Sequence, residues 1–66
     1  MEEQIRTKLI ELGYPFNENL RVKETKFGYF KLIQNNRLGK VDIINHKTQG
    51  TILKVYSGDF KTTIKL

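Results

Sequence analysis

From residue 19 to the C-terminus, the sequence alternates apolar and polar residues in short segments separated by clusters of turn residues. Such alternation puts apolar side chains on one face of a strand and polar side chains on the other. Glycines at 28, 39, 50 and 58 punctuate the pattern at the spacing of an antiparallel meander. The expected strands and turns are LRVKET, YFKLIQ, the turn-rich NNRLGK, VDIIN, the turn HKTQG, TILKVY, the turn SGD and FKTTIKL.

Residues 2–12 predict one amphipathic helix ahead of these strands. Ile5, Leu9 and Leu12 recur at i, i+4 and i+7, so they fall on one helix face. Gly13 is well placed to end the helix, since glycine adopts the left-handed conformation that many helix C-termini need. The helix therefore supplies one apolar stripe to cover a sheet.

The segment after the helix ends it, because Pro15 cannot continue a helix. Tyr14 and Phe16 are expected to fold back onto the helix as a small hydrophobic plug. A chain of 66 residues has room for one small domain. We predict an α+β domain: a helix over residues 1–13 packed on a four- or five-stranded antiparallel sheet over 19–66, either open or curled toward a barrel.

The last hairpin can be predicted in the most detail. If Gly58 and Asp59 form a two-residue primed turn, Ser57 faces Phe60 and all the following pairs are set. The face expected to receive the helix carries Leu53, Val55, Phe60, Thr62, Ile64 and Leu66. The opposite face, which is basic and holds one aromatic, carries Ile52, Lys54, Tyr56, Lys61, Thr63 and Lys65.

The net charge of +5 is unevenly distributed along the chain. Residues 1–24 carry a balance of −1, whereas residues 25–66 carry eight basic residues against two aspartates. The basic part predicts an anionic partner, most simply nucleic acid. The alternative is a lysine-rich solvated surface, because nine lysines, seven isoleucines and no alanine also fit the bias of an AT-rich genome.

The stretch KFGYFKLI places aromatic residues among lysines. Strand alternation assigns Phe30 and Leu32 to the core and leaves Phe27, Tyr29 and Lys31 on the other face. Aromatic rings beside cations are typical of surfaces on which single-stranded bases stack. The alternative is a half-buried strand with ordinary aromatic packing, since aromatics are enriched in strands.

The same run, at residues 26–33, resembles the first RNA-binding signature of RRM and cold-shock domains, in which basic, glycine and aromatic residues lie on a sheet. The match covers Phe27, Gly28 and Tyr29, and it implies a base-stacking surface. The hairpin at residues 48–66 is similar to one in the TBP-like N-terminal domain of bacterial type III ribonuclease H. That domain engages nucleic acid with its sheet, so this likeness also implies a nucleic-acid partner.

These features predict a non-catalytic nucleic-acid-binding module, with single-stranded DNA or RNA favoured over a sequence-specific duplex. Phosphate contacts are expected from Lys26, Lys31, Lys54, Lys61 and Lys65. Stacking is expected from Phe27, Tyr29 and Tyr56. Further basic residues that are either phosphate contacts from loops or merely solvated are Arg37, Lys40 and Lys47.

Catalysis and metal binding have little support in the sequence. His46 is the only histidine, cysteine is absent, and no motif frames Ser57 as a nucleophile. We therefore expect no enzyme activity, no metal and no cofactor. Neither a signal peptide nor a membrane-spanning run is found, which favours a cytoplasmic location without a membrane partner.

The alternative function is a small protein-interaction factor, namely an inhibitor or regulator of a host protein encoded by a phage or another mobile element. A short, cysteine-free chain of AT-rich composition fits that class. Its exposed strand edges can pair with a host protein or with a second copy in a homodimer.

Overall fold

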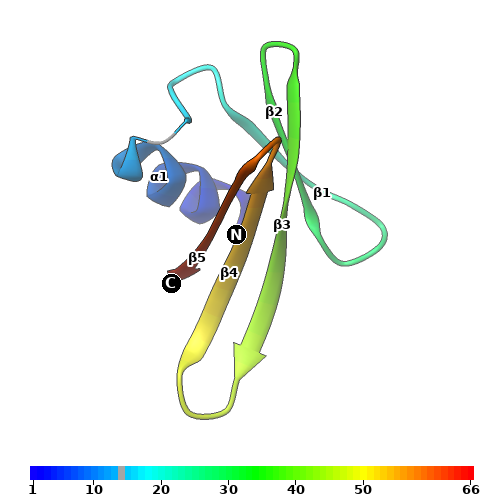
Figure 1. Cartoon of the computed structure of the whole chain (residues 1–66). Coiled ribbons are helices and arrows are strands. Elements are labelled where there is room, and N and C mark those ends of the chain that lie inside the picture. Colours follow the sequence, from blue (N-terminus) through cyan, green and yellow to red (C-terminus); the bar gives the residue numbers. More distant parts are fainter. Residues whose placement is uncertain (14) are drawn as a thin grey trace.

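The computed structural model describes residues 1–13 and 15–66, and within them it has one helix and five strands (Figure 1). The helix, α1, spans Glu2–Leu12. The strands, in chain order, are β1 Arg21–Glu24, β2 Phe30–Gln34, β3 Arg37–His46, β4 Gly50–Ser57 and β5 Phe60–Lys65.

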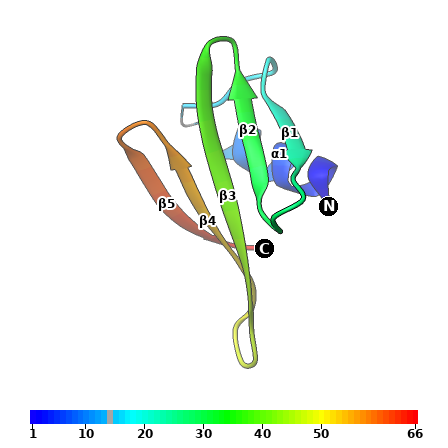
Figure 2. The same ribbon diagram turned by 90° about the vertical axis from the view of Figure 1, so that its right-hand side faces the viewer.

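The strands form a single antiparallel sheet in the order β1-β2-β3-β4-β5. Each strand lies beside its neighbours in sequence, and β1 and β5 are the two edges, so the sheet is open and not closed into a barrel. The helix lies against one face of the sheet (Figures 1 and 2). The predicted α+β class is confirmed, with five strands.

The helix forms where the sequence predicts it. Glu2 and Glu3 stand in its first turn, where their carboxylates interact favourably with the positive end of the helix dipole. It ends at Gly13, whose φ of 71° lies in the left-handed region. Ile5 and Leu9 point at the sheet and are fully buried, so they anchor the helix to the core.

The end of the apolar helix stripe differs from the prediction. Leu12 is 39% exposed, and Ile10 packs against the core in its place. Phe16 is buried as expected, and its ring meets that of Phe60 edge-on with 5.9 Å between centroids. The predicted packing of Tyr14 lies outside the described residues.

A buried amide side chain ties the segment after the helix to the sheet. Gln34, at the end of β2, donates from Nε2 to the Pro15 carbonyl at 2.8 Å. Its Oε1 accepts from the Asn17 backbone N–H at 2.6 Å. One side chain thus satisfies a donor and an acceptor of a segment that has no strand partner.

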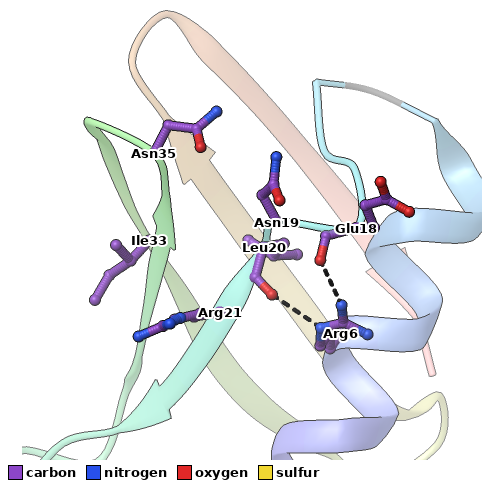
Figure 3. A pocket seen from close by; sticks show the side chains of 7 residues that line it. All are labelled: Arg6, Glu18, Asn19, Leu20, Arg21, Ile33 and Asn35. Carbon is purple, nitrogen blue, oxygen red and sulfur yellow. Dashed lines mark hydrogen bonds between the residues drawn. The ribbon is translucent and has the colours of Figure 1, made fainter.

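A second polar contact joins the helix to the start of β1 (Figure 3). The Arg6 guanidinium donates from Nε to the Leu20 carbonyl at 2.8 Å and from Nη2 to the Glu18 carbonyl at 2.7 Å. Arg6 lies in a polar depression beside this connection. Its charge is therefore used to hold the chain where it enters the sheet.

The strand register divides the sheet into a covered face and an open one. In the last hairpin Ser57 faces Phe60 and Leu53 faces Ile64, which confirms the predicted pairing. Leu66 follows β5 and is exposed, so its predicted place in the core is wrong. The buried apolar core consists of Ile5, Leu9, Phe16, Leu20, Val22, Phe30, Leu32, Val41, Leu53, Val55 and Ile64.

The turn within the segment NNRLGK is shorter than predicted. Only Asn35 and Asn36 form the turn, and Arg37–Lys40 already belong to β3. Gly39 is needed for space: a Cβ atom there would collide with the backbone oxygen of Tyr56 on β4. A glycine that signals a turn in sequence instead permits close approach of two strands.

We expect Gln34→Leu to lower the free energy of unfolding by about 2–3 kcal/mol, since it removes the partners of the Pro15 carbonyl and the Asn17 N–H. Urea denaturation followed by circular dichroism measures this loss. Gln49→Leu, in the exposed β3–β4 turn, is the matched control and should stay within about 0.5 kcal/mol. A loss below about 0.5 kcal/mol for Gln34→Leu would show that water replaces the amide at no cost.

Gly39→Ala should destabilise the fold by about 1–3 kcal/mol, because the added methyl group meets the Tyr56 carbonyl oxygen and the strands must separate. Thermal unfolding compares this variant with Thr63→Ala, an exposed strand position expected to change little. An equal melting temperature for the two variants would contradict the close approach.

Candidate functional site

The face of the sheet opposite the helix, which we call the outer face, is left open to solvent (Figure 2). Figure 2 looks onto this face, with α1 behind the sheet. Because side chains alternate along each strand, the register decides which residues share it. The strand residues of the outer face are Arg21, Lys23, Lys31, Ile33, Leu38, Lys40, Asp42, Ile44, His46, Ile52, Lys54, Tyr56, Lys61, Thr63 and Lys65.

One cross-strand row of the outer face is almost entirely basic. Its members stand directly opposite one another on five consecutive strands, and we call them the lysine row: Lys23, Lys31, Lys40, Tyr56 and Lys61. With strands about 4.8 Å apart, the row extends over roughly 19 Å. Like charges directly opposite each other destabilise a sheet, so the three adjacent lysines cost the protein stability.

Aromatic rings continue from this row toward the β1–β2 turn. The Lys40 Nζ lies 5.5 Å from the ring centroid of Tyr29 and 5.5 Å from that of Tyr56. Tyr29 in turn stacks with Phe27, at 6.4 Å between centroids and 15° between ring planes. We call Phe27, Tyr29 and Tyr56 the aromatic line. Cation–π contacts of Lys40 join its two halves.

The β1–β2 turn holds Phe27 in place. Thr25 closes the turn by donating from its backbone N–H and its hydroxyl to the Tyr29 carbonyl, at 2.9 and 2.8 Å. The Thr25 hydroxyl also accepts from the Phe27 N–H at 3.2 Å, and Gly28 adopts a φ of 85°. Phe27 therefore reaches the outer face from a turn and not, as predicted, from a regular strand.

The exposure of Phe27 is unusual for so large an apolar side chain. It is 83% exposed, while Phe30, three residues on, is buried in the core. Its contact with Tyr29 leaves the other side of the ring free, and it lines a depression together with Lys23 and Lys31. Packing of the core does not account for an aromatic at this position.

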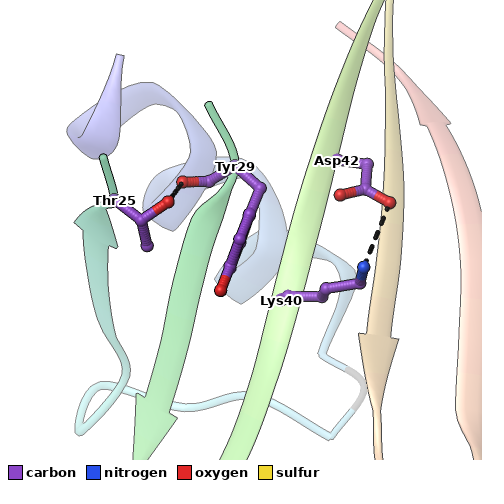
Figure 4. A network of polar contacts seen from close by, with 4 residues as sticks. All are labelled: Thr25, Tyr29, Lys40 and Asp42. Carbon is purple, nitrogen blue, oxygen red and sulfur yellow. Dashed lines mark hydrogen bonds and ion pairs between the residues drawn. The ribbon is translucent and has the colours of Figure 1, made fainter. Parts of the chain in front are cut away.

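One carboxylate interrupts the positive charge of the outer face. The strand residues of this face include seven basic side chains, and Asp42 is the single acid among them. Its Oδ2 lies 3.5 Å from the Lys40 Nζ (Figure 4). Lys54 stands directly opposite Asp42 on β4. The other six acidic residues of the chain are not strand residues of this face, and one of them, Glu24, lines the depression beside Phe27.

The structure places most of the predicted site residues together. Lys31, Lys54, Tyr56, Lys61 and Lys65 all project from strands of the outer face. Phe27 and Tyr29 adjoin it, and Lys26 is exposed in the β1–β2 turn.

Two of the three other basic residues differ from their predicted places. Lys40 is in the middle of the lysine row and not in a loop, because β3 begins earlier than predicted. Arg37 is also on β3, but it alternates toward the covered face and lies beside Gly58. Lys47 is in the β3–β4 turn, as expected.

Lys23 was missed by the sequence reasoning. Strand alternation in the sequence could have identified it, since an apolar Val22 in the core implies that Lys23 points outward. What the sequence lacked was the pairing of β1 with β2, which puts Lys23 directly opposite Lys31.

Comparison with protein-family models finds no family that matches this chain, and comparisons with curated proteins and with solved structures find no similar protein. The resemblances at residues 26–33 and 48–66 therefore stay predictions. Within residues 1–13 and 15–66, no three metal-binding side chains are gathered for a metal ion. In the same residues, no helix has both the length and the apolar character needed to cross a bilayer.

Replacement of the central lysine of three should relieve charge repulsion in the row. We expect Lys31→Thr to raise the free energy of unfolding by about 0.2–1 kcal/mol at low salt, with a smaller gain at ~0.5 M salt, where screening is strong. Urea denaturation at two salt concentrations measures it. Lys47→Thr, in the β3–β4 turn, is the control. Equal effects of both variants at low salt would mean that the row carries no repulsion.

Proposed function

We propose that this protein is a binding module for single-stranded nucleic acid, that it uses the outer face of its sheet, and that it is not an enzyme. One observation carries the proposal: an uncovered sheet face presents a row of lysines with exposed and half-exposed aromatic rings beside it. Either half alone has an ordinary explanation, but together they match the two chemical groups of a single strand.

The lysines supply the contact to the phosphate backbone. Four of the five members of the lysine row are cations. Lys23, Lys31 and Lys40 stand on adjacent strands, and Lys61 follows beyond Tyr56. Binding releases the counterions condensed on the strand, at a slope of about −0.7 in log affinity per log salt for each phosphate neutralised. A polyanion would also offset the repulsion that the row creates in the free protein.

The aromatic line favours a single strand over a duplex. Phe27 has one free ring face, and stacking of a base on such a ring is worth roughly 1–3 kcal/mol. In a duplex the base faces are already stacked on one another, so Phe27 would gain little from them. DNA and RNA both offer free base faces, so the proposal covers both.

A second candidate is the protein-interaction factor, an inhibitor or regulator of a host protein. In the described part of the chain, β5 has no strand beyond it, and β3 continues past its last pair with β2 at Val41. Both segments leave backbone groups available for another strand. Capture of one host protein that persists after nuclease treatment would favour this candidate.

Fluorescence anisotropy with labelled mixed-sequence 20-mers tests the proposal at ~50 mM salt, where electrostatic contacts are strong. We expect single-stranded DNA or RNA to bind, and a duplex of the same sequence to bind more weakly. Phe27→Ala should lower affinity for the single strand roughly fivefold or more, because it removes one stacking surface. Its free energy of unfolding should change by less than about 0.5 kcal/mol, since the side chain is exposed.

The matched control is Leu38→Ala, which removes another highly exposed apolar side chain (72%) that is not aromatic. Its affinity should stay much closer to that of the unmodified protein. The proposal fails if neither single-stranded DNA nor single-stranded RNA binds. The stacking role fails if Phe27→Ala and Leu38→Ala lower affinity equally.

A further inference from the structure

The outer face has two directions along which a single strand can lie. One direction follows the β-strands, and the other crosses them. The charges of three successive cross-strand rows differ, and this difference selects one direction.

Two residues beyond Lys40 along β3, toward His46, lies a second cross-strand row. The charges at the centre of this row nearly cancel. In this second row Asp42 stands opposite Lys54, and Lys54 stands opposite Thr63. The carboxylate of Asp42 also contacts Lys40 at 3.5 Å. A phosphate placed over Lys54 would lie close to the carboxylate directly opposite it, which repels the phosphate. Over Lys40 the same carboxylate is offset by Lys31, which stands directly opposite Lys40 in the lysine row.

The third row is mainly apolar. Ile44 stands opposite Ile52, and Ile52 stands opposite Lys65. Lys65 lies on the edge strand and has no second cation beside it in that row. A strand that followed β3 or β4 would leave the lysines within two positions and meet Asp42 and then isoleucines.

Building on the proposed function, we propose that the single strand crosses the sheet along the lysine row, from Lys23 on β1 to Lys61 on β5, and that Asp42 keeps phosphates off Lys54. The phosphates follow the row, and the bases turn toward the aromatic line. This path assigns binding roles to Lys23 and Lys40 and removes Lys54 and Lys65 from the direct phosphate contacts.

The path has a definite length. The row spans roughly 19 Å, and a single strand advances by at least the stacked rise of about 3.4 Å per nucleotide, so the row holds at most about six nucleotides. Oligothymidine, which lacks secondary structure, is a suitable probe. Affinity should rise steeply from three to six thymidines and only slightly from six to twelve, apart from the statistical gain of extra binding positions.

Neutralising variants measured with six-nucleotide oligothymidine test the path. For single strands, log affinity falls with log salt at a slope of about −0.7 for each phosphate contact. Relative to 1 M salt, one contact therefore raises affinity about eightfold at ~50 mM salt. We expect Lys23→Gln and Lys61→Gln, at the two ends of the row, each to lower affinity five- to tenfold. Lys54→Gln and Lys65→Gln, on the same face with the same change of charge, should each cost at most about twofold. Lys8→Gln, on the helix, controls for net charge.

Replacement of Asp42 gives an independent test with the opposite sign. Asp42→Asn should raise affinity by roughly two- to fivefold and steepen the salt dependence, since Lys40 and Lys54 lose their carboxylate neighbour. In that background Lys54→Gln should become costly, close to the five- to tenfold effect of the row variants. Melting curves confirm that each variant is folded.

The results separate the path from the proposed function. If Lys54→Gln and Lys65→Gln cost as much as Lys23→Gln, or if Asp42→Asn weakens binding, the path across the strands is wrong while the protein still binds a single strand. If the unmodified protein binds neither oligothymidine nor the mixed-sequence single strands, the proposed function itself falls.

Discussion

A single helix can cover only one face of a five-stranded sheet, and the rest of this structure depends on that limit. Ile5 and Leu9 are fully buried against the sheet, and they bring the apolar half of each strand out of water. The register then has to send every second residue to the open side. In a chain with nine lysines, most of which fall at those alternate positions, an exposed basic face follows from the covering of the other face.

The sequence predicts the helix and the last hairpin well, because both depend on local signals. Gly58 and Asp59 set the pairing of β4 with β5, residue by residue. The start of β3 was predicted poorly, because a glycine in the sequence is compatible both with a turn and with the close approach of two strands. Gly39 has the second role, beside the backbone of Tyr56. Such a contact exists only once the strands are paired, so no local pattern contains it.

The candidate site also has one part that local sequence predicts and one part that only strand pairing creates. Phe27, Tyr29 and Lys31 lie close in sequence, and a pattern of aromatics and lysines finds them. The lysine row, in contrast, takes one residue from each strand, and its ends at Lys23 and Lys61 are far apart in the chain. Only the register of four hairpins aligns these residues. Sequence reasoning therefore found the aromatic half of the surface and only part of the basic half.

The concentration of positive charge on the outer face has a consequence for how the molecule turns in an electric field. The strand residues of the outer face carry seven basic groups and one acid, while the remaining side chains carry five basic groups and six acids. The protein therefore has an electric dipole directed through the sheet. In the field of a polyanion this dipole experiences a torque that turns the outer face toward the negative charge, so encounters that begin at this face become more frequent than random tumbling would give.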